Sequence, residues 1–182
     1  MCIRDRRKDG SITAMHFRTA LDGGGYGSYG VASLYYTGAL QTVTYRVPRY
    51  RFEGVRVFTN KPPCGPKRGH GTPQPRFALE CHIDKFCADL GLDPARWRLD
   101  HTVAPGTITA NQMKVRTIGL QICLERVIER SGWRERKGRL GPGRGLGIAG
   151  SSYISGAGLP IYWNALPHSG VQIKVDRGGA FQ

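Results

Sequence analysis

The chain has 182 residues, of which 40% are hydrophobic, and this is enough for one domain with a core or for two small ones, so disorder throughout is excluded. Lys and Arg number 27 against 13 Asp and Glu, and the formal charge of +14 predicts an anionic partner: nucleic acid, a phosphorylated ligand or an acidic subunit. Five cysteines without a CxxC pair predict neither a disulfide framework nor a zinc site. With no apolar run of membrane-spanning length and no export signal, we expect a soluble, cytoplasmic protein.

The first 22 residues contain an opening segment that we leave out of the fold prediction, followed by a predicted strand. The opening MCIRDR is polar and fits no pattern that follows, so we interpret residues 1–8 as a non-native start derived from a sequencing adaptor. After the turn signal at Asp9 and Gly10, the stretch SITAMHFRTALD is rich in Ile, Thr and Phe and predicts a strand. The strand should end at Asp22, where a glycine cluster begins.

The next part of the chain gives weaker signals. Residues 33–40 are compatible with a short helical or irregular segment. Residues 42–45 and 54–58 are rich in β-branched and aromatic side chains, which predicts two strands.

Residues 64–80, CGPKRGHGTPQPRFALE, have the composition of a shaped loop that leads into a helix. Three glycines within seven residues allow positive φ angles and a close approach of the backbone to a ligand. Three prolines prevent a continuous hydrogen-bond ladder. Beyond Pro75, apolar residues recur at offsets of three and four and predict one buried helix face that ends at Gly91. The members of this face are Leu79, Ile83, Phe86, Cys87 and Leu90.

The second half of the chain predicts two further helices and two strands. Asp93 and Pro94 should begin a short helix, as a cap followed by proline. Thr117 should cap a second principal helix that ends near Gly132. Its expected buried face is Leu120, Cys123, Leu124, Val127 and Ile128. The basic, glycine-rich RERKGRLGPGRG predicts a solvated connection, LGIAGSSYI and VQIKVDRGG predict strands, and residues 176–179 a turn.

These signals together predict an α+β fold of mixed strands with two main helices. The irregular stretch at residues 101–111 is the best candidate for a boundary between two units.

Several motifs have alternative interpretations. GGGYGSYG contains GxGxxG at Gly25, Gly27 and Gly30, but a poor amphipathic helix follows it, which disfavours a dinucleotide-binding turn. Arginines and tyrosines alternate between residues 45 and 56, and this pattern fits a solvated strand pair better than an RNA-binding surface. His70 and His168 lie in turn-like segments, where a hydrogen-bonded loop histidine competes with a functional role.

The order of these features resembles the large, molybdopterin-binding subunit of the xanthine dehydrogenase and aldehyde oxidase family. The resemblance begins at the Asp9–Gly10 turn, the following strand and GGGYGSYG. It continues through VPRYRFEGVRVFTNKPPCGPKRGHGTPQPRFALE, which is similar to a proline-containing segment and an R-G-F-G-x-P-Q loop of the family. It implies that residues 9–104 are the C-terminal part of a first molybdopterin-binding domain and residues 105–182 the start of a second.

The family resemblance also implies site residues. In the family this loop approaches the molybdenum end of the cofactor, where backbone N–H groups come close to the metal's oxygen or sulfur ligands. The positions carried over are Arg68, Gly69, His70, Gly71 and Gln74. The family commonly has phenylalanine at the positions of Lys67 and His70, so His70 puts a purine substrate in doubt and becomes a candidate substrate contact.

The loop variant KRGHGTPQPRF and the segment SSYISGAGLPIYWNALPHSGVQIKVDRGG are most similar to the 4-hydroxybenzoyl-CoA reductase branch of the family. This implies reductive removal of a phenolic hydroxyl from an aromatic CoA thioester. The implied cofactors are molybdenum–molybdopterin in the cytosine dinucleotide form, with iron–sulfur clusters and FAD on partner subunits of a hetero-oligomer. Hydroxylation or aldehyde dehydrogenation by the same family is the alternative, and a basic RNA-binding module is the alternative of another class. The family's other cofactor segments and its catalytic glutamate would lie outside residues 9–182, so we assign no catalytic residue or metal ligand.

Overall fold

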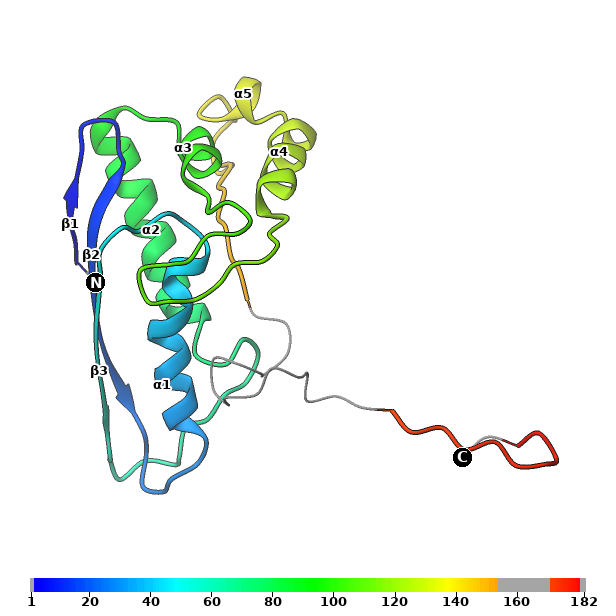
Figure 1. The fold of residues 1–182 in the computed structure, drawn as a ribbon. Coiled ribbons are helices and arrows are strands. Elements are labelled where there is room, and N and C mark those ends of the chain that lie inside the picture. The colour runs from blue at the N-terminus through cyan, green and yellow to red at the C-terminus, as the bar shows by residue number, and fades with distance from the viewer. Residues whose placement is uncertain (1, 154–170, 181–182) are drawn as a thin grey trace.

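The computed structural model describes residues 2–153 and 171–180, and in them a small sheet is covered by helices (Figure 1). In chain order the elements are β1 (Cys2–Arg6), β2 (Ile12–Asp22), α1 (Gly30–Ala39), the 3-10 helix η1 (Leu40–Val43), β3 (Tyr50–Val57), α2 (Pro73–Leu90), α3 (Pro94–His101), α4 (Leu120–Ser131) and α5 (Trp133–Arg136). This mixture confirms the predicted α+β class. Within the described ranges, no helix is both long enough and apolar enough to cross a membrane.

The sheet has the order β1-β2-β3, with β1 antiparallel to β2 and β2 parallel to β3. Met15 lies opposite Tyr50 and Asp22 opposite Val57. Parallel neighbours require a crossover, which α1 supplies, and α1 and α2 lie on the same side of the sheet (Figure 1). Because β2 and β3 run in the same direction, the loops that follow them begin at the same end of the sheet.

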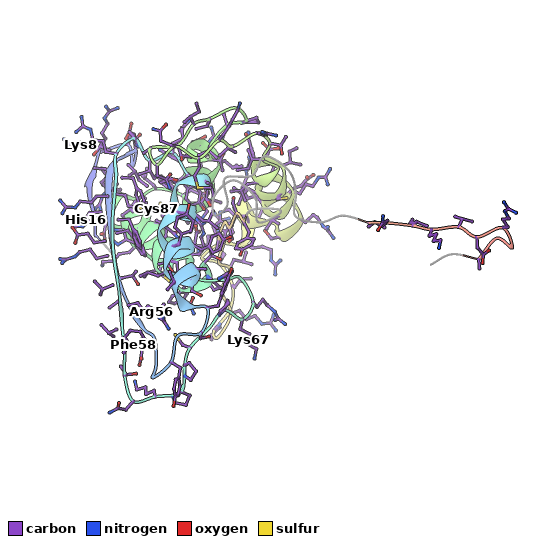
Figure 2. The ribbon with its side chains drawn as sticks, turned by 60° about the horizontal axis from the view of Figure 1, so that its bottom comes forward. Lys8, His16, Arg56, Phe58, Lys67 and Cys87 are labelled. Atoms are coloured by element: carbon purple, nitrogen blue, oxygen red, sulfur yellow. The ribbon has the colours of Figure 1, made fainter. Side chains whose placement is uncertain are left out.

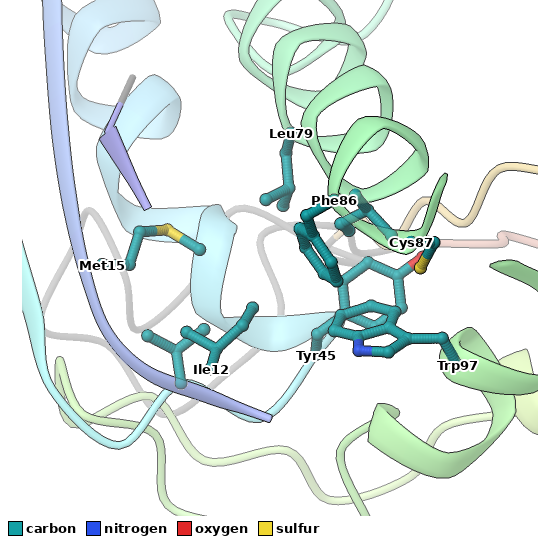
Figure 3. Close-up of a cluster of buried hydrophobic side chains, with 9 residues drawn as sticks. Ile12, Met15, Tyr45, Leu79, Phe86, Cys87 and Trp97 are labelled. Atoms are coloured by element: carbon teal, nitrogen blue, oxygen red, sulfur yellow. The ribbon is translucent and has the colours of Figure 1, made fainter. Parts of the chain in front are cut away.

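The main core lies between the sheet and α2 (Figure 3). The predicted helix face is confirmed, because Leu79, Ile83, Phe86 and Cys87 are buried and Leu90 packs against them. They meet Ile12, Met15, Tyr45, Val47 and Trp97. The helix begins with Pro73 and ends at Leu90, and Gly91 follows it as the predicted stop, in a left-handed conformation with φ of +66°.

A second apolar cluster joins α3, α4 and the segment near Ile148. The predicted cap of α3 is confirmed, since the Asp93 carboxylate accepts a hydrogen bond from the Ala95 backbone N–H at 2.8 Å. The same oxygen accepts a bond from the Trp133 indole N–H at 3.0 Å. The buried members of the cluster are Ala95, Leu124, Trp133 and Ile148.

Two strand predictions in the first part of the chain need correction. Residues 42–45 do not form a strand: α1 continues into η1, whose polar side chains are buried and bonded. The Gln41 side-chain amide donates to the Thr37 carbonyl at 2.8 Å, and the Thr42 hydroxyl donates to Asn111. The other strand is present as β3, but it begins four residues earlier than predicted, at Tyr50.

The start of the chain, for which no element was predicted, contains a strand. Cys2–Arg6 pairs with β2 as strand β1, with Arg6 opposite Ile12. The origin of residues 1–8 and the division into domains at residue 104 stay predictions.

The predicted cap and buried face of α4 are partly wrong. Gly119 precedes the helix without a side-chain cap, so Thr117 does not have that role. Leu124 is buried and Leu120 and Ile128 pack beside it, whereas Cys123 and Val127 are exposed, because α4 contacts its neighbours along one narrow line. The basic connection is exposed as predicted, although its first residues form α5.

The two predicted C-terminal strands are not regular strands where the structure describes them. Residues 146–153 run as an extended segment without a strand partner, and residues 171–174 are exposed and irregular. The turn at residues 176–179 is confirmed by a hydrogen bond from the Gly179 N–H to the Asp176 carbonyl at 3.1 Å. His168 lies outside the described residues.

Candidate functional site

The candidate site is built from the two loops that follow β2 and β3. The Gly25 N–H donates to the Lys61 carbonyl at 2.9 Å, and the Thr59 N–H donates to the Gly24 carbonyl at 3.1 Å. A Cβ atom on Gly24 would lie 2.3 Å from the Pro62 carbonyl oxygen, so the contact between the two backbones requires glycine. The glycine-rich loop after β2 therefore packs against the first part of the loop after β3.

Asp22 fixes the origin of both loops. Its carboxylate accepts hydrogen bonds from the Thr59 hydroxyl at 2.6 Å, the Lys61 ammonium at 2.9 Å and the Gly24 N–H at 3.1 Å. These bonds, that of Thr59 foremost, favour the charged carboxylate and lower its pKa to about 2. Lys67 lies farther along the loop after β3, and its exposed side chain points outward (Figure 2).

The loop then makes a turn in which three successive residues have positive φ angles. The angles are +92° at Gly69, +34° at His70 and +80° at Gly71. A Cβ atom on Gly71 would lie 2.1 Å from the Ser33 carbonyl oxygen of α1, so the turn packs backbone against backbone. A histidine at positive φ is uncommon and is held here by glycines on either side.

His70 points toward α1, and its ring packs in tilted contacts with two tyrosines. The centre of its ring is 5.2 Å from that of Tyr29 and 4.7 Å from that of Tyr36. Its Nε2 atom is enclosed and has no hydrogen-bond partner among the described residues. Removal from water disfavours the imidazolium and lowers the pKa of His70 below its usual value. Tyr36 in turn lies 6.2 Å, ring to ring, from Tyr153.

Beside the turn, a cleft of about 640 Å³ separates α2 from the segment 147–153. Arg68 and Gly69 line its entrance, and Arg76 and Glu80 lie on the face of α2 that borders it. The remaining lining residues are Thr72, Pro73, Phe77, Cys81, Asp84, Gly147, Ile148, Ala149, Gly150, Ser151 and Tyr153.

The wall formed by α2 contains two buried charges. Arg76 is 5% exposed and donates from Nη2 to the Leu40 carbonyl at 2.8 Å, while its Nε and Nη1 atoms have no partner in the described part of the chain. Burial lowers the pKa of Arg76, but a guanidinium keeps its charge at neutral pH. Glu80 is equally buried and is ion-paired with Arg98 at 2.8 Å.

The structure brings together only part of the predicted site. Arg68 and Gly69 border the cleft, and Gly71 shapes the turn against α1. His70 faces α1, and the exposed Gln74 is not among the residues that line the cleft.

The sequence analysis missed Arg76 and Glu80. Both could have been found, because they are charged residues on the apolar helix face predicted for Leu79 and Ile83. Charges on a buried face need partners, and such positions are candidates for structural or ligand-binding roles.

The loop after β2 does not form a dinucleotide site. The guanidinium of Arg56 donates to the carbonyls of Gly23 and Tyr26 at 3.2 and 3.3 Å, and also to that of Gly27. A phosphate needs N–H donors in this position, whereas this loop directs carbonyl groups inward and already encloses a cation.

The alternative of an RNA-binding surface at residues 45–56, which the sequence disfavoured, gains no support from the tyrosines of this region. Tyr45 is fully buried in the core, and the Tyr50 hydroxyl donates to the Gly38 carbonyl at 2.7 Å on the α1 side of the sheet. These two tyrosines therefore offer no face on which a base could stack.

The cleft is suited to an anionic ligand that the backbone can approach. Gly69 places no Cβ atom at the lining of the cleft, and Arg68 and Arg76 supply positive charge there. Among the described residues, no group of three or more His, Cys, Asp or Glu side chains could hold a metal ion.

Comparison with known proteins identifies the family. Residues 6–101 match the model of the molybdopterin cofactor-binding domain. The chain is 32% identical over 160 residues to a xanthine dehydrogenase molybdenum-binding subunit of Escherichia coli O157:H7, which covers 81% of this chain and 20% of that protein. It is 33% identical over 100 residues to an aldehyde oxidoreductase of Megalodesulfovibrio gigas, which covers 55% of this chain and 11% of the relative.

Two solved structures are similar in fold to most of this chain. The quinoline 2-oxidoreductase of Pseudomonas putida 86 has a TM-score of 0.64 at 26% identity, covering 71% of this chain and 18% of that one. An aldehyde oxidoreductase of Desulfovibrio gigas has a TM-score of 0.61 at 23% identity over 73% of this chain and 15% of its own, a likeness of fold. This chain thus spans a fifth or less of the length of these relatives. With the family model matched over more than half of its residues, the chain belongs to the molybdopterin cofactor-binding domain family.

Proposed function

We propose that this chain supplies one part of the molybdopterin site of a molybdenum-dependent oxidoreductase. The observation that carries the proposal is the start of the turn at Gly69, where a residue without a side chain lines a cleft that Arg68 and Arg76 also line. The bound cofactor would supply the redox chemistry, while these residues would hold its anionic groups and shape the approach to it.

The cofactor proposal is tested by measuring molybdenum and pterin in the purified intact protein. Arg68→Ala should lower the molybdenum content severalfold, because it removes a charge at the entrance of the cleft. Lys67→Ala is the matched control, since its side chain is an exposed cation in the same loop outside the cleft lining. Equal molybdenum content in both variants and the parent protein would contradict a role for Arg68.

For the substrate, we propose an aromatic CoA thioester whose phenolic hydroxyl is replaced by hydrogen with release of water. The excess of 27 basic over 13 acidic residues suits the phosphates of CoA. Electrons would arrive from iron–sulfur clusters and FAD on partner subunits, and the cofactor would be the cytosine dinucleotide form. A relative that is named as a molybdenum-binding subunit supports separate partner subunits.

The second candidate is a hydroxylase or aldehyde dehydrogenase of the same family. The names of the relatives, which include xanthine dehydrogenase and aldehyde oxidoreductase, favour it. Turnover of 4-hydroxybenzoyl-CoA with a reduced electron donor, compared with oxidation of xanthine and of an aromatic aldehyde, separates the two. Oxidation without any dehydroxylation would overturn the thioester proposal.

His70 is proposed to act close to the substrate, through its ring and through the contact of Tyr36 with Tyr153 at the cleft. Replacing His70 by Ala should reduce turnover while molybdenum stays bound. His70→Phe separates two roles, because phenylalanine keeps an aromatic ring in contact with Tyr29 and Tyr36 but has no ring nitrogen. Full turnover in the Phe variant would show that the ring only packs, and full turnover in both would remove the proposed role.

A further inference from the structure

Glu80 connects three segments of the chain through one carboxylate oxygen. Its Oε2 atom accepts a hydrogen bond from the Arg98 Nε–H at 2.8 Å and another from the Gly150 backbone N–H at 3.0 Å. Glu80 belongs to α2, Arg98 to α3 and Gly150 to the segment that forms the opposite wall of the cleft. A buried charge thus bonds to a backbone group 70 residues away in the sequence.

Arg98 is held firmly enough to fix the carboxylate. It is fully buried, donates from Nη1 to the Pro94 carbonyl at 3.0 Å and pairs through Nη2 with Asp84 at 2.8 Å. Burial disfavours its charged form, but the nearby Glu80 carboxylate more than offsets this and the pKa of Arg98 is raised. The Arg98 guanidinium therefore keeps its charge, and the ion pair restricts the orientation of both side chains.

The segment that donates this hydrogen bond has little regular secondary structure to hold it in place. Residues 146–153 have no strand partner in the described part of the chain, and Ile148 is the segment's buried apolar anchor. Gly150 packs so closely that an added Cβ would lie 2.5 Å from the Tyr45 hydroxyl oxygen. The Glu80 bond is consequently well placed to determine how far this segment stands from α2.

We infer that Glu80 and Arg98 form a buried clamp that positions residues 147–153 as the second wall of the cleft. Glu80 acts here as a positioning residue through the Gly150 N–H. The clamp itself stands on the contacts described, whereas its effect on cofactor retention rests on the proposed function.

Two conservative variants of Glu80 test the reach and the charge of the carboxylate separately. Glu80→Gln keeps a side-chain oxygen at full length that can accept from both Arg98 and Gly150, although it lacks the charge. Glu80→Asp keeps the charge but is one methylene shorter, so it cannot reach both donors from the α2 backbone. Asp84→Asn is the control, because Asp84 is the other acidic partner of Arg98 and is half exposed.

The experiment is hydrogen exchange of peptides covering residues 147–153 in the intact protein, with molybdenum content measured on the same samples. In Glu80→Asp, exchange at Gly150 should become at least about tenfold faster, whereas in Glu80→Gln and Asp84→Asn it should stay close to that of the parent. Unchanged exchange in Glu80→Asp, or equal acceleration in Asp84→Asn, would overturn the clamp. Faster exchange with undiminished molybdenum would support the clamp and contradict the proposed cofactor role of this wall.

Discussion

Thr37 and Gly71 join α1 directly to the turn at the candidate site, since the Thr37 hydroxyl lies 2.7 Å from the Gly71 carbonyl oxygen. The same hydroxyl lies 2.9 Å from the Ser33 carbonyl, which is also the group that closely approaches Gly71. One turn of α1 thus contacts Gly71 both at its carbonyl oxygen and at its Cα. The crossover helix of the β2-α1-β3 unit is therefore the support on which the loop rests.

Gly71→Ala should destabilise the protein by about 2–4 kcal/mol, because the new methyl group meets backbone at a positive φ that alanine disfavours. Chemical unfolding of the intact protein, followed by fluorescence and by protection of residues 69–76 against hydrogen exchange, would measure the loss. Gly27→Ala is the control, since its Cβ would meet nothing within 4 Å. A Gly71 variant as stable as the Gly27 variant would contradict this packing.

The hydrogen bonds accepted by Asp22 should make the stability of the loops after β2 and β3 depend on pH in the acid range. The folded protein holds the pKa of Asp22 at about 2, below its usual value near 4, so its contribution is complete above about pH 4 and is lost as the pH falls toward 2. Asp22→Asn should remove this part of the pH dependence while it retains one side-chain acceptor. Limited proteolysis of residues 58–68 between pH 5 and 2 would check it, and identical profiles for both proteins would contradict the assignment.

Asp93 should stabilise the contact between α3 and α5, because one carboxylate oxygen both caps α3 and accepts from the Trp133 indole. Asp93→Ala should cost about 1–2 kcal/mol, whereas Asp93→Asn should stay within about 0.5 kcal/mol, since Asn is an equally good cap. Unfolding monitored by tryptophan fluorescence measures both. A similar loss in the two variants would show that the charge matters more than the cap.

The elements that the sequence predicted well depend on local signals. The buried face of α2 follows from the spacing of Leu79 and Ile83, its end from Gly91, and the start of α3 from Asp93 and Pro94. Each of these signals acts within a few residues, so tertiary contacts are not needed to recognise it.

The elements that the sequence analysis missed depend on contacts between distant residues. The β-branched residues before Tyr45 become the 3-10 helix η1 and its end, because Thr42 bonds to Asn111 and the Thr44 carbonyl accepts from the Val103 N–H. The wall at Gly150 likewise depends on Glu80. Propensity is a weak guide where buried polar groups find partners far along the chain.

Gly150 and Tyr45 provide a paired test of the packing behind the cleft wall. Gly150→Ala should destabilise the protein by about 1–3 kcal/mol, because its Cβ would lie 2.5 Å from the Tyr45 hydroxyl oxygen in a fully buried site.

Tyr45→Phe removes that oxygen, and the next atom of the ring, Cζ, would be 3.4 Å from the new methyl group, which is an ordinary contact. The Tyr45 hydroxyl makes no hydrogen bond of normal geometry among the described residues, although the nearby Glu80 carboxylate adds to burial in raising its pKa, so its removal alone should cost no more than about 1 kcal/mol. The double variant should therefore be more stable than Gly150→Ala alone, with a coupling energy of at least about 1 kcal/mol in a double-mutant cycle. Simple additivity of the two changes would mean that residues 147–153 do not lie against Tyr45, and the cleft would then lose its second wall.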